Sequence, residues 1–344
     1  MSTITDVARR AGVSVTTVSH VINGTRFVSD ELRLRVTAAM EELRYRPNYM
    51  ARSLRSGETK IIGLVVPDNS NPFFAEISRV IEDVGFENGY SVILCNSDGD
   101  LNKEQAYINL LISKQVDGVI FIASGSKQDL LEELITNKIQ VIVADRKIPQ
   151  SMADVVLVNN EQGGYIASGH LVALGHERIG CISGPSDLTP SADRVKGYER
   201  ALSEANIPIQ DELIVAGDLR YQGGEKAMQR LLELNTPPTA VFASNDMMAI
   251  GAMRAIHNAG LRIPEDVSLV GFDDIPLAAA LFPALTTVSQ PMTELAQLTA
   301  KRLIDRIQNS EENFNPQQYI LETELIVRDS CAPPRMTVLG KSHE

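Results

Sequence analysis

The chain has 344 residues, 44% hydrophobic and 5% aromatic, and its 32 Lys and Arg against 44 Asp and Glu give a net charge of −12. Three widely spaced cysteines, Cys95, Cys181 and Cys331, exclude a disulfide framework and a cysteine-ligated metal cluster. The N-terminus lacks the pattern of a signal peptide, and no apolar run reaches the roughly 18 residues of a membrane helix. We therefore expect a soluble, cytoplasmic protein of two or three domains with no membrane contact.

The acidic total conceals an uneven distribution of charge. Residues 1–60 hold ten Lys and Arg and six Asp and Glu, a net +4, whereas the remaining 284 residues hold the other 22 basic and 38 acidic residues, a net −16. A basic segment on an acidic body predicts a domain boundary near residue 60 and presentation of the head to an anionic polymer. Chance variation in a short terminal segment is the alternative explanation of the charge.

The head predicts three helices. Thr3 and Ser14 can cap helices over residues 4–11 and 15–23, and each of these helices is followed by a glycine. A third apolar pattern, over residues 29–43, closes a three-helix core. Two short helices joined by a three-residue turn form a helix-turn-helix.

The second predicted helix has an apolar and a polar face. Its inward face is expected to carry Val18, Val21 and Ile22, which fall at helical spacing. The outward face then carries small or hydrogen-bonding side chains that fit a major groove: Val15, Thr16, Thr17, Ser19 and His20. In helix-turn-helix proteins this end of the second helix reaches base edges, while hydroxyls and the helix start hold phosphates. A generic helical hairpin with a solvated polar face is the alternative.

Residues 5–24, TDVARRAGVSVTTVSHVING, closely resemble the DNA-binding head of LacI/GalR-family repressors, and the match continues through YRPN at 45–48 and ARSL at 51–54. The resemblance implies that Val15 and Thr16 read bases and that His20 makes a further base contact, where many family members have Arg. The complete set of DNA contacts that it implies is Thr5, Val15, Thr16, Thr17, Ser19, His20, Asn23, Asn48, Ala51 and Leu54.

Residues 47–60 are expected to form a hinge helix and linker after a head of residues 1–46. The segment from Asn48 to Leu54 is too short to persist as an isolated helix in water. In the family this helix pairs with its dimer mate on DNA, and the residue matching Leu54 wedges into the minor groove and kinks the operator. An ordinary buried linker leucine is the alternative for Leu54.

From residue 61 onward, apolar runs alternate with amphipathic stretches. The expected strands are 61–66, 91–95, 118–122, 140–144, 178–182, 240–243 and 268–272, and residues 73–88 form the first expected helix. This repetition is typical of βαβ units and parallel sheets, which bind ligands beyond the strand carboxyl ends. The body is large for one such sheet. We expect an all-α helix-turn-helix head and an α/β body of two doubly wound parallel-sheet lobes.

The body resembles the family's sugar-sensing core and, through it, periplasmic ribose-binding proteins, in which two lobes flank a cleft. This resemblance implies one lobe of residues 61–160 and 291–321, nearer the DNA, and a second of residues 161–290 and 322–334. Residues 335–344 are polar and follow two prolines, so we expect a disordered tail. The C-terminal segment has no leucine heptads, which favours a homodimer over a tetramer.

Polar and aromatic residues follow several predicted strands. Alone, each is a weak signal, because an Asp at a strand end is usually a helix cap or turn former. Together they suit a polyol, since carboxylates and amides bond to vicinal hydroxyls, arginines fork across adjacent oxygens and aromatic rings cover a sugar face. By resemblance to ribose-binding relatives, the ligand positions are Asn71, Phe73, Phe74, Asp145, Arg146, Arg194, Leu219, Asn245, Asp273 and Gln290.

Two positions depart from those relatives. They have an aromatic ring where this chain has Leu219, and the ribose-binding protein has an amide where this chain has Ala123. Loss of a hydrogen-bonding partner costs ~1–3 kcal/mol when nothing replaces it. Tyr221 is a candidate to replace the ring. Ribose is the first expected effector, among other pentoses.

An enzyme is disfavoured by the motifs. The sequence has no P-loop, no Gly-x-Gly-x-x-Gly after the first strand and no serine with a recognisable base, and His170 and His176 lack metal-ligand spacing. We expect no catalytic residue, no metal and no cofactor. A sugar-binding protein without regulatory output would have no use for the head.

We predict a homodimeric repressor that reads a palindromic operator. Sugar that closes the cleft would separate the hinge helices and release the DNA, which requires the ligand to bind the two states with different affinity. A purine or phosphorylated-sugar corepressor that strengthens DNA binding has the same architecture and stays an alternative.

Overall fold

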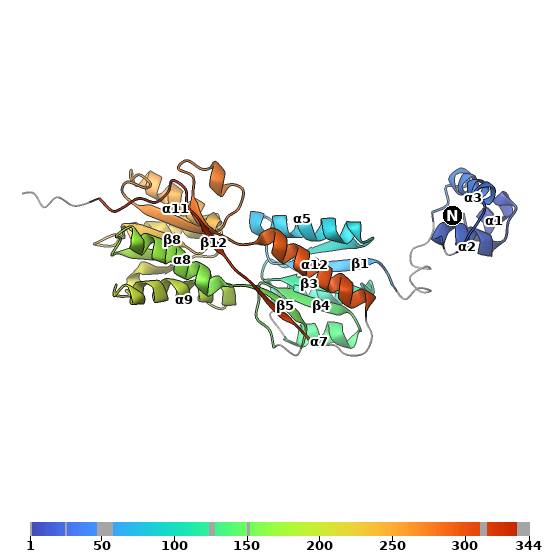
Figure 1. Cartoon of the computed structure of the whole chain (residues 1–344), viewed down its shortest axis with the longest axis horizontal. Helices are drawn as coiled ribbons and strands as arrows, with labels where there is room; N and C mark the ends of the chain where they lie inside the picture. The colour runs from blue at the N-terminus through green and yellow to red at the C-terminus, as the bar shows by residue number, and fades with distance from the viewer. Residues whose placement is uncertain are drawn as a thin grey trace, which may run out of the picture. The chain divides into compact units, whose positions relative to one another are not determined.

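The computed structural model describes residues 2–24, 26–46, 58–123, 128–149, 152–309 and 315–335. The chain divides into two compact units, residues 1–59 and 60–344 (Figure 1). Within the described ranges no helix is long and apolar enough to cross a membrane.

The head contains α1 (Ile4–Ala11), α2 (Val15–Asn23) and α3 (Asp30–Glu42). Thr3 caps α1 reciprocally, because its hydroxyl accepts from Asp6 N at 3.3 Å while its own N–H donates to Asp6 Oδ2 at 2.9 Å. Ser14 Oγ caps α2 by accepting from Thr17 N at 3.0 Å. Gly12 and Gly24 end these helices with φ of 64° and 63°, a left-handed conformation that favours glycine. The predicted bounds of both helices are confirmed.

A small apolar core joins the three helices. Its buried members are Val7, Ala8, Ala11, Val18, Val36 and Ala39. Val21 and Ile22 are half-buried and pack against this core, so the predicted inward face of α2 is confirmed. Because these three apolar positions face the core, the rest of α2 faces outward.

The first sheet of the body has the strand order β11-β5-β4-β3-β1-β2, and all its neighbours are parallel. Its strands are β1 (Ile61–Val66), β2 (Ser91–Asn96), β3 (Gly118–Ile122), β4 (Gln140–Ala144), β5 (Asp154–Val158) and β11 (Gln318–Leu321). One face packs against α5 (Pro72–Glu87) and α12 (Met292–Gln308), and the other against α6 (Leu101–Ser113) and α7 (Gln128–Thr136). We call this sheet and its helices lobe 1.

The second sheet has the order β12-β10-β9-β8-β6-β7. Its strands are β6 (Ile179–Ser183), β7 (Ile214–Ala216), β8 (Ala240–Ala243), β9 (Ser268–Asp273), β10 (Thr286–Ser289) and β12 (Glu324–Ile326). Helices α8 (Asn160–Ala173) and α9 (Thr189–Glu204) pack on one face, and α10 (Tyr221–Leu232) and α11 (Asp246–Asn258) on the other. Short 3-10 turns cover Asp211–Leu213 and Ala278–Ala280. We call this sheet and its helices lobe 2.

The two sheets confirm the expected α/β architecture with one exception, since β12 runs antiparallel to β10. All seven predicted strands are present, the fifth shifted by one residue to Ile179–Ser183. Five strands were missed: β5, β7, β10, β11 and β12. Four of these have only three or four residues, which is too short for a clear apolar run. The fifth, β5, follows β4 with no described helix between them, which breaks the alternation of strands and helices.

The chain passes between the lobes three times, after β5, between β10 and α12, and between β11 and β12. Helix α12 therefore lies beside α5 although more than 200 residues separate them in sequence (Figure 1). Asn159 Nδ2, at the first crossing, donates to the carboxylate of Glu322, at the third, at 3.0 and 3.3 Å. Three parallel connections of this kind are suited to hinge motion of the two lobes.

Of the predicted tail, residues 335–344, only Arg335 is described, and it forms an ion pair with Asp266 at 2.6 Å.

Candidate functional site

The outward face of α2 carries five of the predicted DNA contacts. Val15 and Thr16 are exposed, Val15 to 42%. The other three, Thr17, Ser19 and His20, are half-buried. Side chains of this size and chemistry can approach base edges without a long flexible stem.

Hydrogen bonds fix both ends of this face. The hydroxyl oxygens of Ser14 and Thr17 are 2.9 Å apart. At the other end, Asn23 Nδ2 donates to the carbonyl oxygen of Ser19 at 2.8 Å and to its hydroxyl at 3.2 Å. Thr5 is exposed in the first turn of α1. The predicted contacts of the head thus lie on exposed or half-buried positions of α1 and α2.

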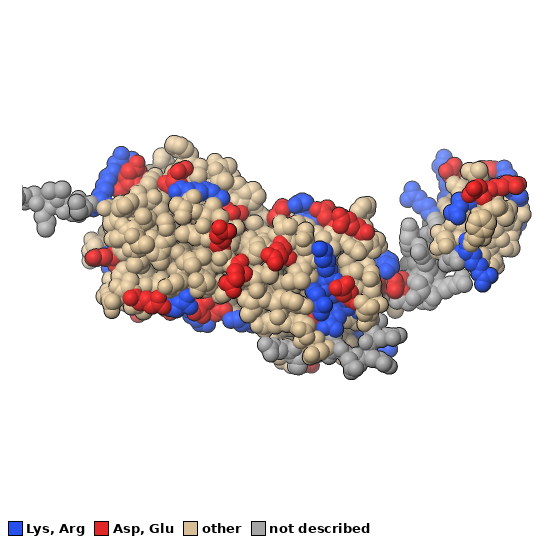
Figure 2. Space-filling model, viewed as in Figure 1, with Lys and Arg blue, Asp and Glu red and all other residues tan. Residues whose placement is uncertain are grey.

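The predicted hinge contacts Asn48, Ala51 and Leu54 lie outside the described residues. Acidic side chains are spread over both lobes on the face of the body in Figure 2, in keeping with the net charge of −16 of residues 61–344.

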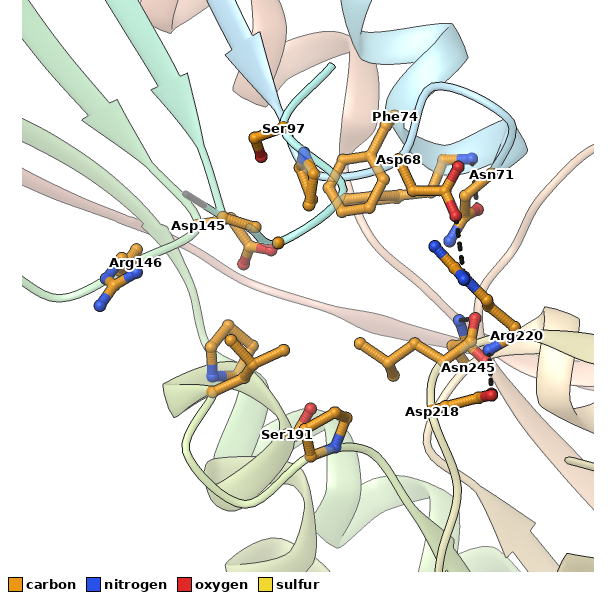
Figure 3. Close-up of a pocket in the computed structure, with 18 of the residues that line it drawn as sticks. Asp68, Asn71, Phe74, Ser97, Asp145, Arg146, Ser191, Asp218, Arg220 and Asn245 are labelled. Atoms are coloured by element: carbon orange, nitrogen blue, oxygen red, sulfur yellow. Dashed lines mark hydrogen bonds and ion pairs between the residues drawn. The ribbon is translucent and has the colours of Figure 1, made fainter. Parts of the chain in front are cut away.

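A cleft of ≈ 480 Å³ lies between lobe 1 and lobe 2 at the carboxyl ends of their strands. Nine of the ten predicted ligand positions line it: Asn71, Phe73, Phe74, Asp145, Arg146, Arg194, Leu219, Asn245 and Asp273. Figure 3 shows Asn71, Phe74, Asp145 and Arg146 on the lobe 1 side and Asn245 on the lobe 2 side. The fold therefore brings together residues that are up to 202 positions apart in sequence.

The lobe 1 wall begins at the start of α5. Asn71 is the N-cap, and its Oδ1 accepts from Phe73 N at 3.0 Å. The rings of Phe73 and Phe74 meet edge to face with centroids 5.1 Å apart. Capping fixes the first turn of the helix, so it also fixes both rings against the cleft.

Asp145 directly follows β4 and is 4% exposed. Its φ of 54° lies in the left-handed region, which turns the chain sharply at the strand end. Burial raises the pKa of this carboxyl to about 6, although Arg194 and a hydrogen bond from Asn160 act in the opposite direction. The half-buried Arg146 follows it and also lines the cleft.

Arg194 is the buried cation of the cleft. It is 5% exposed, its Nε donates to Asn160 Oδ1 at 2.8 Å, and its Nη1 donates to the carbonyl oxygen of Ser244 at 2.6 Å. Its guanidinium carbon lies 3.8 Å from the centroid of the Phe272 ring. These contacts hold the planar group in one orientation, with Asp273 Oδ1 at 3.5 Å from Nη1.

Asp273 ends β9 and is 3% exposed. Burial raises its pKa to about 7, opposed by Arg194 and by a hydrogen bond from Gln290, with Asp145 adding to the rise. Gln290 Nε2 donates to Asp273 Oδ1 at 2.7 Å. Gln290 itself does not line the cleft. Among the described residues its Oε1 is buried without a hydrogen-bond partner, so this residue orients Asp273 from behind.

Asn245 and Leu219 form part of the lobe 2 wall. Asn245 caps α11, with its Oδ1 accepting from Met248 N at 2.9 Å, and its Nδ2 donates to the carbonyl oxygen of Leu219 at 3.0 Å. The backbone of Leu219 has a φ of 63°. The side chain of Leu219 adds apolar surface to the lining of the cleft. Tyr221, the candidate to replace the missing ring, does not line the cleft, so this prediction was wrong.

Sequence reasoning missed several lining residues. Asp68 follows β1, Ser97 follows β2 and Asp218 follows β7. The strand-end rule would have found the first two, whereas β7 was itself missed. The remaining missed polar lining residues are Asp98, Glu104, Asp187, Thr189, Ser191 and Arg220.

Two ion pairs between described residues join the lobes. Arg220 Nε in lobe 2 lies 3.2 Å from Asp68 Oδ2 in lobe 1 (Figure 3). Lys147 Nζ, which follows β4, lies 2.7 Å from Asp193 Oδ2 on α9. Both pairs form only when the lobes are close, so they favour the closed arrangement.

The lining is predominantly acidic, with seven Asp and Glu and three Arg. Three of these carboxylates are buried, Asp145, Asp273 and Glu104, and the first two share one buried guanidinium, Arg194. Such a cleft attracts neutral ligands that donate hydrogen bonds and repels anionic ones.

Comparison with known proteins agrees with both units. Residues 3–48 match the family described as bacterial regulatory proteins, lacI family, and residues 168–331 match a periplasmic binding protein-like domain. The chain is 39% identical over 331 residues to the HTH-type transcriptional repressor PurR of Photobacterium profundum, covering 96% of this chain and 98% of that protein. It is 42% identical over 330 residues to the ribose operon repressor of Haemophilus influenzae, with the same coverage.

Solved structures give the same picture. The lac repressor dimer bound to operator and the anti-inducer ONPF has a TM-score of 0.85 at 28% identity, covering 96% of this chain and 99% of that chain. A LacI family transcriptional regulator from Enterococcus faecium with bound ribose has a TM-score of 0.73 at 34% identity, covering 80% of this chain and 100% of that chain.

Proposed function

The chain belongs to the lacI family and is a DNA-binding transcriptional repressor rather than an enzyme; we propose that a ribose-like pentose bound between its lobes releases it from a palindromic operator. The observation that carries the proposal is the cleft, in which buried carboxylates, an amide and a guanidinium from both lobes converge beside two phenylalanine rings. As a regulator of operator DNA, the protein would act in the cytoplasm as a homodimer.

Each part of the cleft has a role in this proposal. Asp145 and Asp273 would accept from ring hydroxyls, Arg194 would donate to adjacent oxygens, and Asn245 would exchange hydrogen bonds with a further hydroxyl. The rings of Phe73 and Phe74 would cover an apolar face of the sugar ring. Because these groups belong to both lobes, one small ligand would contact both and stabilise their closed arrangement.

The acidic lining favours a neutral sugar over a phosphorylated one. A phosphate brings about two negative charges at neutral pH into a cleft that already has an acidic excess. The ribose-bound regulator and the ribose operon repressor among the relatives support a pentose. The relatives named PurR make a free purine, acting as a corepressor, the second candidate.

Whether the ligand weakens or strengthens DNA binding would depend on how closure of the two lobes changes the head region. The three crossings between the lobes form a hinge, and lobe 1 begins directly after the segment that contains Leu54. In the proposed mechanism, closure around the sugar shifts lobe 1 of each protomer and separates the paired hinge helices. A difference of ~1–3 kcal/mol in the free energy of sugar binding between the DNA-bound and DNA-free states would be sufficient to couple sugar binding to DNA release.

A gel shift with the full-length protein and its operator tests the proposal. We expect ribose to release DNA, and ribose 5-phosphate and hypoxanthine to leave the complex unchanged. Calorimetry should detect heat with ribose for the intact chain and none for Asn245→Ala. Tighter operator binding with hypoxanthine would replace the inducer proposal with the corepressor one.

A further inference from the structure

A second, outer pocket of ≈ 800 Å³ adjoins the cleft and extends the region available to a ligand. The two spaces share Asp68, Asn71, Asp98, Leu219 and Arg220. The outer pocket has further walls from both lobes, formed by the loop before α5 and the end of β2 on one side and by the starts of α10 and α11 on the other. It therefore also depends on the closed arrangement of the lobes.

The boundary between the two spaces is the ion pair of Asp68 with Arg220, at 3.2 Å (Figure 3). The Arg220 side chain is 56% exposed and that of Asp68 22% exposed. An ion pair this exposed contributes little to stability, so a ligand group that extends from the cleft can displace it at small cost.

Side-chain to backbone hydrogen bonds hold both walls in place. In lobe 1, Asn69 N donates to Asn96 Oδ1 at 2.6 Å, which ties the loop before α5 to the end of β2. In lobe 2, Arg220 N donates to Asp218 Oδ1 at 2.9 Å. A preformed pocket loses little conformational entropy when it binds a ligand.

The outer walls differ in chemistry from the inner cleft. They carry amides, among them Asn69, Asn96 and Gln222, together with the phenol ring of Tyr221 and the thioether of Met247. Amides pair with the donor and acceptor edge of a nucleobase, a tyrosine ring stacks on its face, and a thioether makes favourable contacts with aromatic rings. A second sugar ring could also use the amides and pack on Tyr221, but it would gain less from the thioether of Met247, which favours an aromatic partner.

From this division we propose that the complete ligand is a nucleoside, with its ribose in the inner cleft and its base in the outer pocket past Asp68 and Arg220. The inference rests on the proposed function, because it keeps the inner cleft as the sugar site. It assigns the outer pocket to the group attached to the anomeric carbon. It also gives Tyr221 and Gln222, at the start of α10, the role of selecting that group.

Calorimetry on the full-length protein with ribose, 1-O-methyl-β-riboside, inosine, uridine and xylobiose tests the inference. We expect at least one nucleoside to bind about tenfold tighter than ribose, equal to ~1.4 kcal/mol, since its base would stack on Tyr221. The methyl riboside should bind about as tightly as ribose. Tyr221→Ala and Gln222→Ala should remove most of the nucleoside advantage while leaving the affinity for ribose unchanged.

Gln229→Ala is the matched control, because Gln229 is exposed on the same helix and lines neither space. Nucleosides that bind no tighter than ribose, or variants that leave their advantage intact, would overturn the outer-pocket assignment and leave the sugar site standing. Xylobiose tighter than both nucleosides would replace the base by a second sugar. Binding of nucleosides without detectable ribose binding would support the outer pocket but would exclude ribose alone as the effector. If none of the five ligands bound, both proposals would be wrong.

Discussion

Arg194 and Asp273 form a buried pair whose atoms Nη1 and Oδ1 are 3.5 Å apart, with 6% and 4% of their side chains exposed. The guanidinium is also within the electrostatic range of Asp145, whose carboxyl is likewise buried. One cation therefore serves two carboxylates in a place that water barely reaches. Because of this imbalance, ligand binding and stability should both depend on Arg194 and on pH.

Replacement of the shared cation should damage both stability and binding. Arg194→Ala leaves two buried carboxylates without their guanidinium, and we expect it to lower the free energy of unfolding by about 3–5 kcal/mol. Urea unfolding measures the change. Arg254→Ala removes an exposed ion pair with Glu225, 62% exposed on the arginine side, and should cost less than about 1 kcal/mol. Equal losses for the two variants would contradict the buried-pair argument.

The stability of the core should depend on pH through Asp145 and Asp273. Burial raises their pKa values from 3.8 to about 6 and about 7. Between pH 4 and 7 the folded chain then binds more protons at these sites than the unfolded chain, so their contribution to stability falls as pH rises. Relative to the wild type, the free energy of unfolding of Asp273→Asn should rise by on the order of a few kcal/mol between pH 4 and pH 7. A stability difference that is constant between pH 4 and 7 would contradict the raised pKa.

The position of Leu219 offers a gain-of-affinity test. It lies in the cleft where ribose-binding relatives have an aromatic ring, and its apolar side chain supplies no ring stacking. Leu219→Phe should tighten ribose binding by about 2- to 10-fold, which corresponds to ~0.5–1.5 kcal/mol from the aromatic contact. Calorimetry gives the affinity. Leu277→Phe, at an exposed position outside the cleft lining, should leave it unchanged.

The proposed wedge is testable at Leu54. If this side chain inserts into the minor groove at the operator centre, Leu54→Ala should weaken operator binding about tenfold or more, equal to at least about 1.4 kcal/mol, and should reduce the DNA bend. Gel shifts with bent and unbent operator fragments report both quantities. Leu34→Ala, 72% exposed on α3, is a matched control. Unchanged affinity and bend for Leu54→Ala would favour an ordinary linker leucine.

The head shows how far local sequence determines structure. The caps Thr3 and Ser14, the stop glycines and the apolar spacing of Val18, Val21 and Ile22 predicted α1 and α2 with their observed bounds. These signals are local, because a cap bonds to the backbone three residues away and a glycine can adopt the left-handed conformation that ends a helix without steric cost. Strands such as β10, with the sequence TTVS, carry no such signal, since their buried state depends on neighbours in the sheet.

The arrangement of the cleft could not be predicted from the identity of its residues alone. The sequence alone predicted a basic head, an acidic two-lobed body and polar strand ends, and resemblance to relatives supplied most of the proposed contact positions. Only the tertiary structure revealed that Gln290 lies behind Asp273 rather than in the cleft, that Arg220 pairs with Asp68 across the lobes, and that a second pocket lies beyond that pair. The physical reason is distance along the chain: Asp68 and Arg220 are 152 residues apart, and no local propensity encodes which strand ends meet when two sheets close on each other.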